Sequence, residues 1–380
     1  MIRWFYKYGF VIYLFNTILY SISWTKDSIA PIFFYLTMGF GIFFLILTPD
    51  YSRQVLFQKS FLFLMIINLV NLVYLLFFDS FLNISSLEYL MARFMSFSLI
   101  CLSIHSNFNY YKKNFQSIIV RVISLVVVIS LMFNPNIFSG RYEGIIWNPN
   151  MFASLTVLAF CFLFLKTNKK TLFEKALLVL LLIVTISTGS RSAMIAIIMS
   201  FIFKYGLTFR NVFYSIVGIF IFFIISNLDL NTSINRLSNQ MLFNDRIEQF
   251  SFAIHNIQQN LLSGYGLSEY SGLPSSINIP KNLKGLFMGA HNGYLSILIQ
   301  YGIIFGGLVI LIIFNKSLEI IRFYYGKNDY NLVYLFLIVY TLIAANFESL
   351  ITGINEFHTI LFWFALSYLS YSKSLEENAN

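Results

Sequence analysis

Long apolar runs separated by short polar turns fill most of this 380-residue sequence and leave it few ways to fold. Only 11% of the residues are charged, 58% are hydrophobic, and the mean hydropathy of +0.74 is far above that of soluble domains. A run of about 17 to 25 apolar residues crosses a bilayer as a helix. The pattern therefore predicts an all-α polytopic membrane protein, with residues 1–380 forming a single integral membrane domain.

The apolar runs predict about twelve transmembrane helices, several of them short. They cover residues 8–22, 29–48, 61–78, 87–104, 117–133, 150–165, 172–187, 191–205, 211–226, 292–314, 331–346 and 355–371.

The positions of Lys and Arg predict the orientation of these helices. If both termini are cytoplasmic, most of the 25 cations lie at the inner ends of the spans, and the short outer loops keep only Lys26, Arg141 and Arg191. This asymmetry is the positive-inside bias. It accounts for the net charge of +9, so nucleic-acid binding is not indicated. Cys101 and Cys161 fall within predicted spans without a CxxC spacing, which is typical of small buried side chains.

One long polar loop, residues 227–291, separates the ninth and tenth predicted spans and lies on the outer side. Long loops in compact proteins usually carry function. Residues 245–262 of this loop predict an amphipathic helix that lies along the bilayer surface or roofs a cavity. Its apolar stripe has the helical spacing of three and four, at Ile247, Phe250, Ile254, Ile257 and Leu261.

The motif Trp-Asn-Pro-Asn precedes the sixth predicted span. Asn148 suits a helix N-cap and Pro149 suits the first helical position, so the motif predicts a helix start. In a functional interpretation, Arg141 and Glu143 join Asn148 and Asn150 as polar groups of an outer pocket.

Residues 188–192, with the sequence Thr-Gly-Ser-Arg-Ser, predict a tight outer turn. Ser190 would cap the next helix and Arg191 would lie in its first turn. An arginine at the membrane edge without a nearby acid in sequence either extends to lipid headgroups or binds an anion. A phosphate group fits, because the helix N-terminus adds free N–H groups and positive charge.

Two further candidate residues lie in the long loop. Arg246 opens the loop helix, where it either pairs with Glu248 or contributes positive charge to a site. His291 precedes the tenth span together with Asn292. A histidine there either caps the helix or accepts a proton near neutral pH. The histidines and acids lack the spacing of a metal site.

Three predicted spans, beginning at Asn150, Arg191 and Asn292, run from the outer side inwards. Their N-termini therefore point outwards together with Arg191, Arg246 and His291. This constellation predicts a site for a diphosphate with a nearby proton acceptor.

A set of motifs in this part of the chain resembles the O-antigen ligase and O-antigen polymerase (Wzy) superfamily. The resemblance is most specific over residues 148–307. It comprises NPNxxA at 148–153, TGSRSA at 188–193, the arginine Arg246, GYGL at 264–267, and HNGYL at 291–295 followed by Gly302. One position departs from the ligase pattern, with Phe305 in place of a small residue.

The resemblance implies a GT-C-like glycosyltransferase that uses undecaprenyl-diphosphate-linked glycans on the outer side of the bacterial inner membrane. It also implies that Arg191 and Arg246 hold the lipid diphosphate and that His291 lies near the transfer site. No metal or cofactor is expected, since diphosphate is a good leaving group and the arginines absorb its charge. Glu143, Asp245, Glu248 and Glu269 remain alternatives to His291 as the base.

Three functions are compatible with these observations. The favoured one is a polymerase of lipid-linked repeat units, because the chain is rich in Phe, Tyr and Asn, as divergent serotype-specific polymerases are. A ligase that delivers the glycan to lipid A core differs only in its acceptor. A flippase or transporter is less favoured, because the spans are nearly free of charge apart from Arg93. A chain-length regulator and a flippase are candidate partners.

Overall fold

The computed structural model describes residues 2–79, 83–138, 140–167, 169–206, 208–211, 213, 216–217, 244–269, 290–327 and 331–379. Most of the predicted span 211–226, and loop residues 227–243 and 270–289, lie outside this part. Over the described residues the protein is helical, and an isolated β-bridge pairs Ile22 with Ile146.

Each predicted span other than 211–226 coincides with a helix, so the all-α polytopic membrane fold is confirmed. The apolar helices are α1 (Ile2–Leu19), α2 (Ile29–Leu47), α4 (Leu62–Phe78), α5 (Ile84–Tyr110), α6 (Gln116–Phe133), α7 (Pro149–Leu165), α8 (Leu172–Ser187), α9 (Arg191–Tyr205), α13 (Gly293–Tyr324), α14 (Leu332–Ala344) and α15 (Phe357–Ala379). Shorter or polar elements are α3 (Pro49–Leu56), the π-helical turn η1 (Tyr111–Phe115), α12 (Asn244–Gln259) and the 3-10 turn η2 (Leu267–Glu269). Three helical stretches, 29–47, 84–133 and 293–324, are individually long and apolar enough to cross a membrane.

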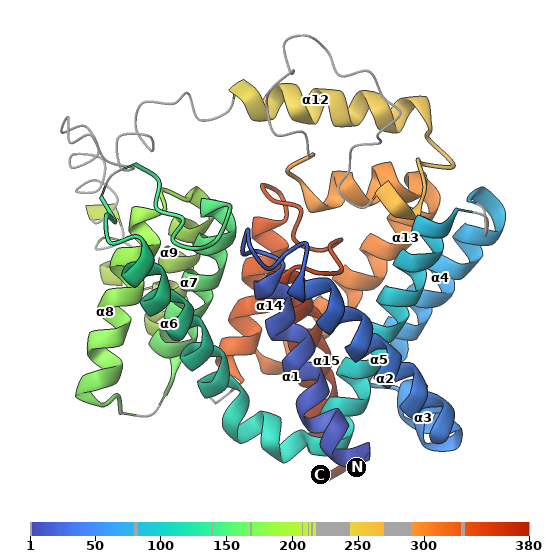
Figure 1. The fold of residues 1–380 in the computed structure, drawn as a ribbon, viewed down its shortest axis with the longest axis horizontal. Helices are drawn as coiled ribbons and strands as arrows, with labels where there is room; N and C mark the ends of the chain where they lie inside the picture. Colours follow the sequence, from blue (N-terminus) through green and yellow to red (C-terminus); the bar gives the residue numbers. More distant parts are fainter. Residues whose placement is uncertain are drawn as a thin grey trace.

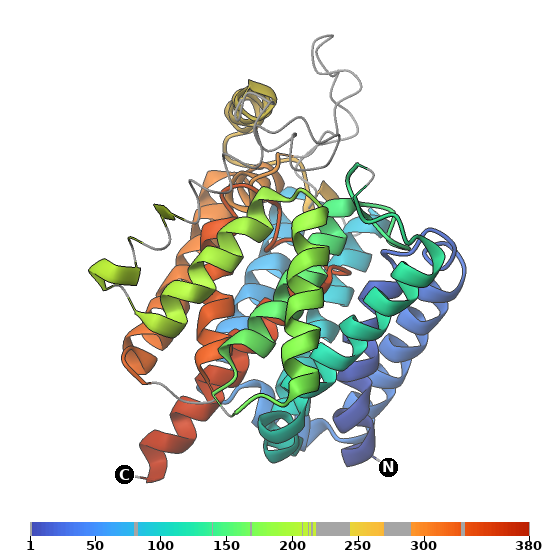
Figure 2. The ribbon, with the colours of Figure 1, turned by 90° about the vertical axis from the view of Figure 1, so that its left-hand side faces the viewer.

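The helices form one bundle with α12 lying across one end and both chain termini at the other (Figures 1 and 2). We call the first of these the α12 end. Helix α15 runs through the middle and is buried along most of its length. Helix α2, in contrast, exposes Phe33, Leu36, Phe40 and Phe43. An outer helix with this composition is stable when its exposed face meets lipid.

Helix α13 is broken at Gly302, where φ is 73°. The predicted span 292–314 coincides with α13 but is interrupted by this break. Residues 293–301 lie across the α12 end, and the rest of α13 descends through the bundle (Figure 1). The kink frees backbone groups, and the chain that follows α12 binds them. The bonds run from Tyr265 N to Ile299 O (2.9 Å), from Gly266 N to Gln300 O (3.1 Å) and from Ile303 N to Leu261 O (2.8 Å).

Two glycines permit this contact between backbones. A Cβ atom added at Gly264 would lie 2.6 Å from Gln300 O, and one added at Gly302 would lie 2.6 Å from the Leu262 carbonyl carbon. Both residues also have positive φ, which glycine adopts without steric cost. Gly264 also closes the turn that follows α12, with its N–H bonded to Asn260 O.

We expect Gly302→Ala to destabilise the protein, because the new methyl group meets backbone and the φ of 73° is strained for alanine. Strain of this kind costs about 1–3 kcal/mol before the clash is counted. Thermal unfolding of the purified protein measures the loss. The matched control is Gly307→Ala in the same helix, where an added Cβ has no neighbour within 4 Å. Equal melting temperatures for the two variants would contradict the explanation.

Helix α12 coincides with the predicted segment 245–262, except that it ends three residues earlier, at Gln259. Only part of its apolar stripe meets the bundle, because Ile257 is buried there. Ile247 and Ile254 are exposed, whereas Ala253 and Asn256 are buried. The small Ala253 allows α12 to pack closely on the first segment of α13, where it joins Ile257, Ala290 and Ile299 in a small apolar cluster. The face of α12 that packs on the bundle is therefore set by the small side chain that allows close approach, and not by the apolar stripe alone.

Candidate functional site

The turn between α8 and α9 places Arg191 at the start of α9, as the sequence predicts. Thr188 and Ser190 are almost fully buried, and Gly189 has a φ of 62°. Ser190 occupies the N-cap position but makes no side-chain cap. Its Oγ instead lies 3.0 Å from Ser192 Oγ. The N-terminus of α9 therefore keeps backbone N–H groups without a side-chain cap from Ser190, with the half-buried Arg191 beside them.

Arg141 joins this turn to the start of α7. Its Nε donates to Thr188 O (3.2 Å), and its guanidinium also donates to Asn150 Oδ1. Asn148 caps α7 by accepting from Asn150 N (2.8 Å). The Asn-Pro-Asn motif thus starts a helix, and it also supplies a polar contact to Arg141. The outer pocket that it would line stays a prediction. Glu143 is exposed and takes no part in these contacts.

The loop around Arg141 is itself firmly packed. Tyr142 N donates to Ser187 O (3.0 Å), and its phenol donates to Asn134 O (2.8 Å). Burial raises the pKa of Tyr142 to about 12, so this phenol remains a proton donor at neutral pH. The loop therefore holds Arg141 on a fixed support.

His291 lies in a turn held by the residues that follow α14. Asn292 caps α13 by accepting from Tyr294 N and Leu295 N, both at 3.0 Å, and donates to Asn346 O (3.2 Å). Gly293 N lies 2.7 Å from Ala345 O and 3.1 Å from Glu348 O. His291 has a φ of 43°, a conformation that costs free energy in a non-glycine residue and persists only when its surroundings impose it.

Glu348 is a site residue that the sequence analysis did not identify. Its Oε2 lies 3.7 Å from His291 Nδ1, and both side chains are 18% exposed. The residues are far apart in sequence, and neither belongs to a motif that names the other. The one feature of the sequence that could have indicated Glu348 is its position, as an acid just after the outer end of the predicted span 331–346.

Helix α14 brings the two turns to the same end of the bundle. Tyr340 Oη, on α14, donates to Ser192 O (3.2 Å), next to Arg191. Five residues later, Ala345 O binds Gly293 N beside His291. Five helical residues advance about 7 Å along the axis. The N-termini of α9 and α13 therefore lie at the α12 end, and Arg141 links the start of α7 to the turn before α9.

Other predicted site residues contribute less to this geometry. Arg246 lies in the first turn of α12, but the side chains of Asp245 and Arg246 lie outside the described part of the structure. Glu248 is exposed on α12, and Glu269 is half-buried at the end of η2. The assignment of Arg246 to the diphosphate stays a prediction.

His358 is a structural residue of the bundle. It is buried on α15, with Nδ1 3.1 Å from Ser154 Oγ and Nε2 2.8 Å from Thr341 Oγ1. It thereby connects α15 to α7 and α14. Among the residues that the structure describes, no three His, Cys, Asp or Glu side chains are grouped to hold a metal ion.

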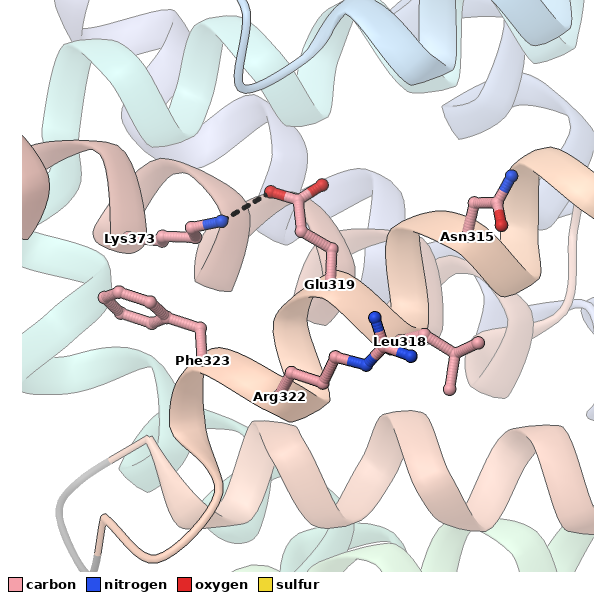
Figure 3. Close-up of a pocket in the computed structure, with 6 residues that line it drawn as sticks. All are labelled: Asn315, Leu318, Glu319, Arg322, Phe323 and Lys373. Atoms are coloured by element: carbon pink, nitrogen blue, oxygen red, sulfur yellow. Dashed lines mark hydrogen bonds and ion pairs between the residues drawn. The ribbon is translucent and has the colours of Figure 1, made fainter.

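One open pocket in the described part of the structure lies elsewhere. It has a volume of about 490 Å³ and is lined by residues near the C-terminal ends of α13 and α15 (Figure 3), whereas His291 precedes the start of α13. Lys373 and Glu319 form an ion pair of 2.8 Å in its wall. It is lined by Asn315, Leu318, Glu319, Arg322, Phe323 and Lys373. The residues around Arg191 and His291 are therefore the better candidate site, because they combine cations, helix N-termini and a proton acceptor.

Comparison with known families supports the same region. A search of curated proteins found no match to the chain. Residues 176–312 match a family model described as O-antigen ligase. The matched segment runs from α8 into α13 and contains Arg191, Arg246 and His291. Over this segment the chain is therefore similar to the O-antigen ligase and polymerase superfamily, and the match supports glycan processing of that type.

Proposed function

We propose that the protein is a polymerase that joins undecaprenyl-diphosphate-linked oligosaccharide repeat units at the outer face of the bacterial inner membrane. The observation that carries the proposal is that α14 and its C-cap bind the starts of both α9 and α13, so that Arg191 and His291 lie at the same end of the bundle, within the family-matched segment. Helix N-termini with an adjacent arginine bind phosphate groups.

The proposed reaction is a glycosyl transfer without a metal or cofactor. The acceptor hydroxyl loses its proton to His291 and its oxygen bonds to the anomeric carbon of the donor. The bond from that carbon to the phosphate oxygen breaks, and its electron pair leaves with undecaprenyl diphosphate. Arg191, Arg246 and the N-terminus of α9 stabilise the negative charge that develops on the leaving group. The products are a lengthened lipid-linked glycan and undecaprenyl diphosphate.

Purified protein in nanodiscs, supplied with lipid-linked repeat units in excess EDTA, tests this function. A polymerase forms a ladder of lengthened glycans from these units alone. A ligase forms product only after lipid A core is added. If neither product forms with lipid-linked repeat units that another glycosyltransferase can use as donors, both functions are rejected. An EDTA-sensitive activity restored by Mg²⁺ would reject the metal-free chemistry.

The transport alternative is less favoured by the surroundings of Arg93. This buried arginine on α5 donates to Thr352 O and to Tyr89 Oη (3.0 Å), and its guanidinium lies 5.5 Å from the Phe97 ring. Such fixed partners, two on α5 itself and one on the segment before α15, favour a structural role, whereas transporters place charges along a substrate path.

The proposed orientation predicts which positions react with a membrane-impermeant thiol reagent. Ser251→Cys lies on the exposed side of α12 and is expected to be labelled from outside the cell. Lys169→Cys, in the exposed turn between α7 and α8, is expected to be labelled only after permeabilisation. The native Cys101 and Cys161 are fully buried and are first replaced by alanine. Labelling of Lys169→Cys in intact cells would place the site on the cytoplasmic side.

A further inference from the structure

We propose that Glu348 is a positioning residue for His291, and that its carboxylate orients the imidazole and stabilises it once it has taken the acceptor's proton. The proposal rests on the glycosyl transfer proposed above. It assigns a role to a residue in the segment between α14 and α15, beyond the family-matched residues 176–312.

The backbone around Glu348 holds the backbone around His291. Gly293 N lies within hydrogen-bonding distance of both Ala345 O (2.7 Å) and Glu348 O (3.1 Å), and Asn292 Nδ2 donates to Asn346 O (3.2 Å). Ser296 Oγ and Ser349 Oγ lie 3.3 Å apart one turn further on. These contacts fix the two turns against each other. The left-handed conformation of His291 is therefore imposed by the segment that contains Glu348.

The side chains complete the pair. His291 Nδ1 and Glu348 Oε2 are 3.7 Å apart, which is a close ionic contact but longer than a hydrogen bond. Catalytic hydrogen bonds are often long in a ligand-free protein and shorten when substrate binds. Each side chain keeps 18% of its surface exposed, so the pair is shielded but can still reach a substrate.

In this geometry the two ring nitrogens of His291 have different roles. A carboxylate next to Nδ1 favours the tautomer with hydrogen on Nδ1, which leaves Nε2 as the proton acceptor. The acceptor O–H bond breaks, its proton moves to Nε2, and its oxygen bonds to the anomeric carbon. The phosphate oxygen of the donor leaves with the electron pair. The ring becomes an imidazolium, whose positive charge the Glu348 carboxylate stabilises.

Other charged groups near this turn have different partners. Glu356, in the same segment, accepts from Thr359 Oγ1 (3.0 Å), and Arg93 donates to Thr352 O. The first segment of α13, residues 293–301, and all of α14 carry no charged residue. Arg191 begins α9, which is bonded to α14 by the hydrogen bond from Tyr340 Oη to Ser192 O. Glu348 is thus the acid placed by the described structure against the imidazole of His291.

Kinetic measurements on E348Q and E348D test the assignment. We expect E348Q to lower kcat about 10- to 100-fold with little change in KM, since the base is misaligned while the donor site is intact. E348D, which keeps the charge, should recover part of the loss. The matched control is D27N, because Asp27 is an exposed acid paired only loosely with Lys26 (4.0 Å). E348Q should also add little to the loss in H291A.

A second readout does not require turnover. Nitrogen-15 NMR of histidine-labelled protein above neutral pH reports which ring nitrogen carries hydrogen, and H291A identifies the His291 signal. We expect wild-type His291 to carry hydrogen mainly on Nδ1, and E348A to lose this preference. A tautomer and a kcat unchanged in E348A and E348Q would overturn the pairing. An inactive wild-type protein with the expected tautomer change would instead reject the proposed polymerase while the pairing stands.

Discussion

Replacing Arg191 with alanine is expected to abolish polymer formation while the protein still inserts and folds. The guanidinium lies at the first position of α9, on a buried turn, where it adds to the positive end of the helix. Its loss removes a permanent positive charge and a planar donor that can bind two phosphate oxygens at once. Arg191→Lys should restore only part of the activity, because an ammonium group lacks this two-pronged geometry.

Gel analysis of polymer length and a donor-binding measurement would read this effect. Arg53→Ala is the matched control, since Arg53 is exposed on α3, away from the α12 end. It should leave polymer length unchanged. Arg141 is a poorer control, because its bonds to Thr188 O and Asn150 hold the turn itself. Polymer of wild-type length from Arg191→Ala would remove this residue from the diphosphate site.

Replacing His291 is expected to lower the transfer rate by about two to four orders of magnitude with donor binding little changed, as for the loss of a general base. His291→Ala removes the base but also places alanine in the left-handed region. His291→Asn is the cleaner variant. Asparagine tolerates this conformation better than most residues and cannot accept the proton.

Thermal unfolding separates a catalytic His291 from one that serves only the structure. The cap of α13 is made by Asn292, which accepts from Tyr294 N and Leu295 N, so His291→Asn should leave the melting temperature nearly unchanged. Asn292→Ala should lower the melting temperature, because the loss of a helix cap typically reduces the free energy of unfolding by about 1 kcal/mol. A stable His291→Asn protein with near-normal turnover would transfer the role of base to a carboxylate in the long loop.

The sequence alone determined the features that depend on local composition. The length of an apolar run decides whether it can cross a bilayer, so the spans coincide with the observed helices to within a few residues at most ends. Capping is equally local, because Asn148 and Asn292 bind N–H groups two or three residues away. The motifs around Arg191 and His291 lie in the segment that matches the family model.

Only the tertiary structure decided which distant segments meet. The break at Gly302 depends on the chain after α12, which approaches closely enough to take its backbone hydrogen bonds. The apolar stripe of α12 indicated a helix, but the helix contacts the bundle through Ala253 and Asn256 as well as Ile257 of the stripe. Glu348 meets His291 because α14 ends beside the start of α13. Periodicity and propensity describe neighbours along the chain, whereas these contacts arise from the packing of helices that the chain connects through long intervening segments.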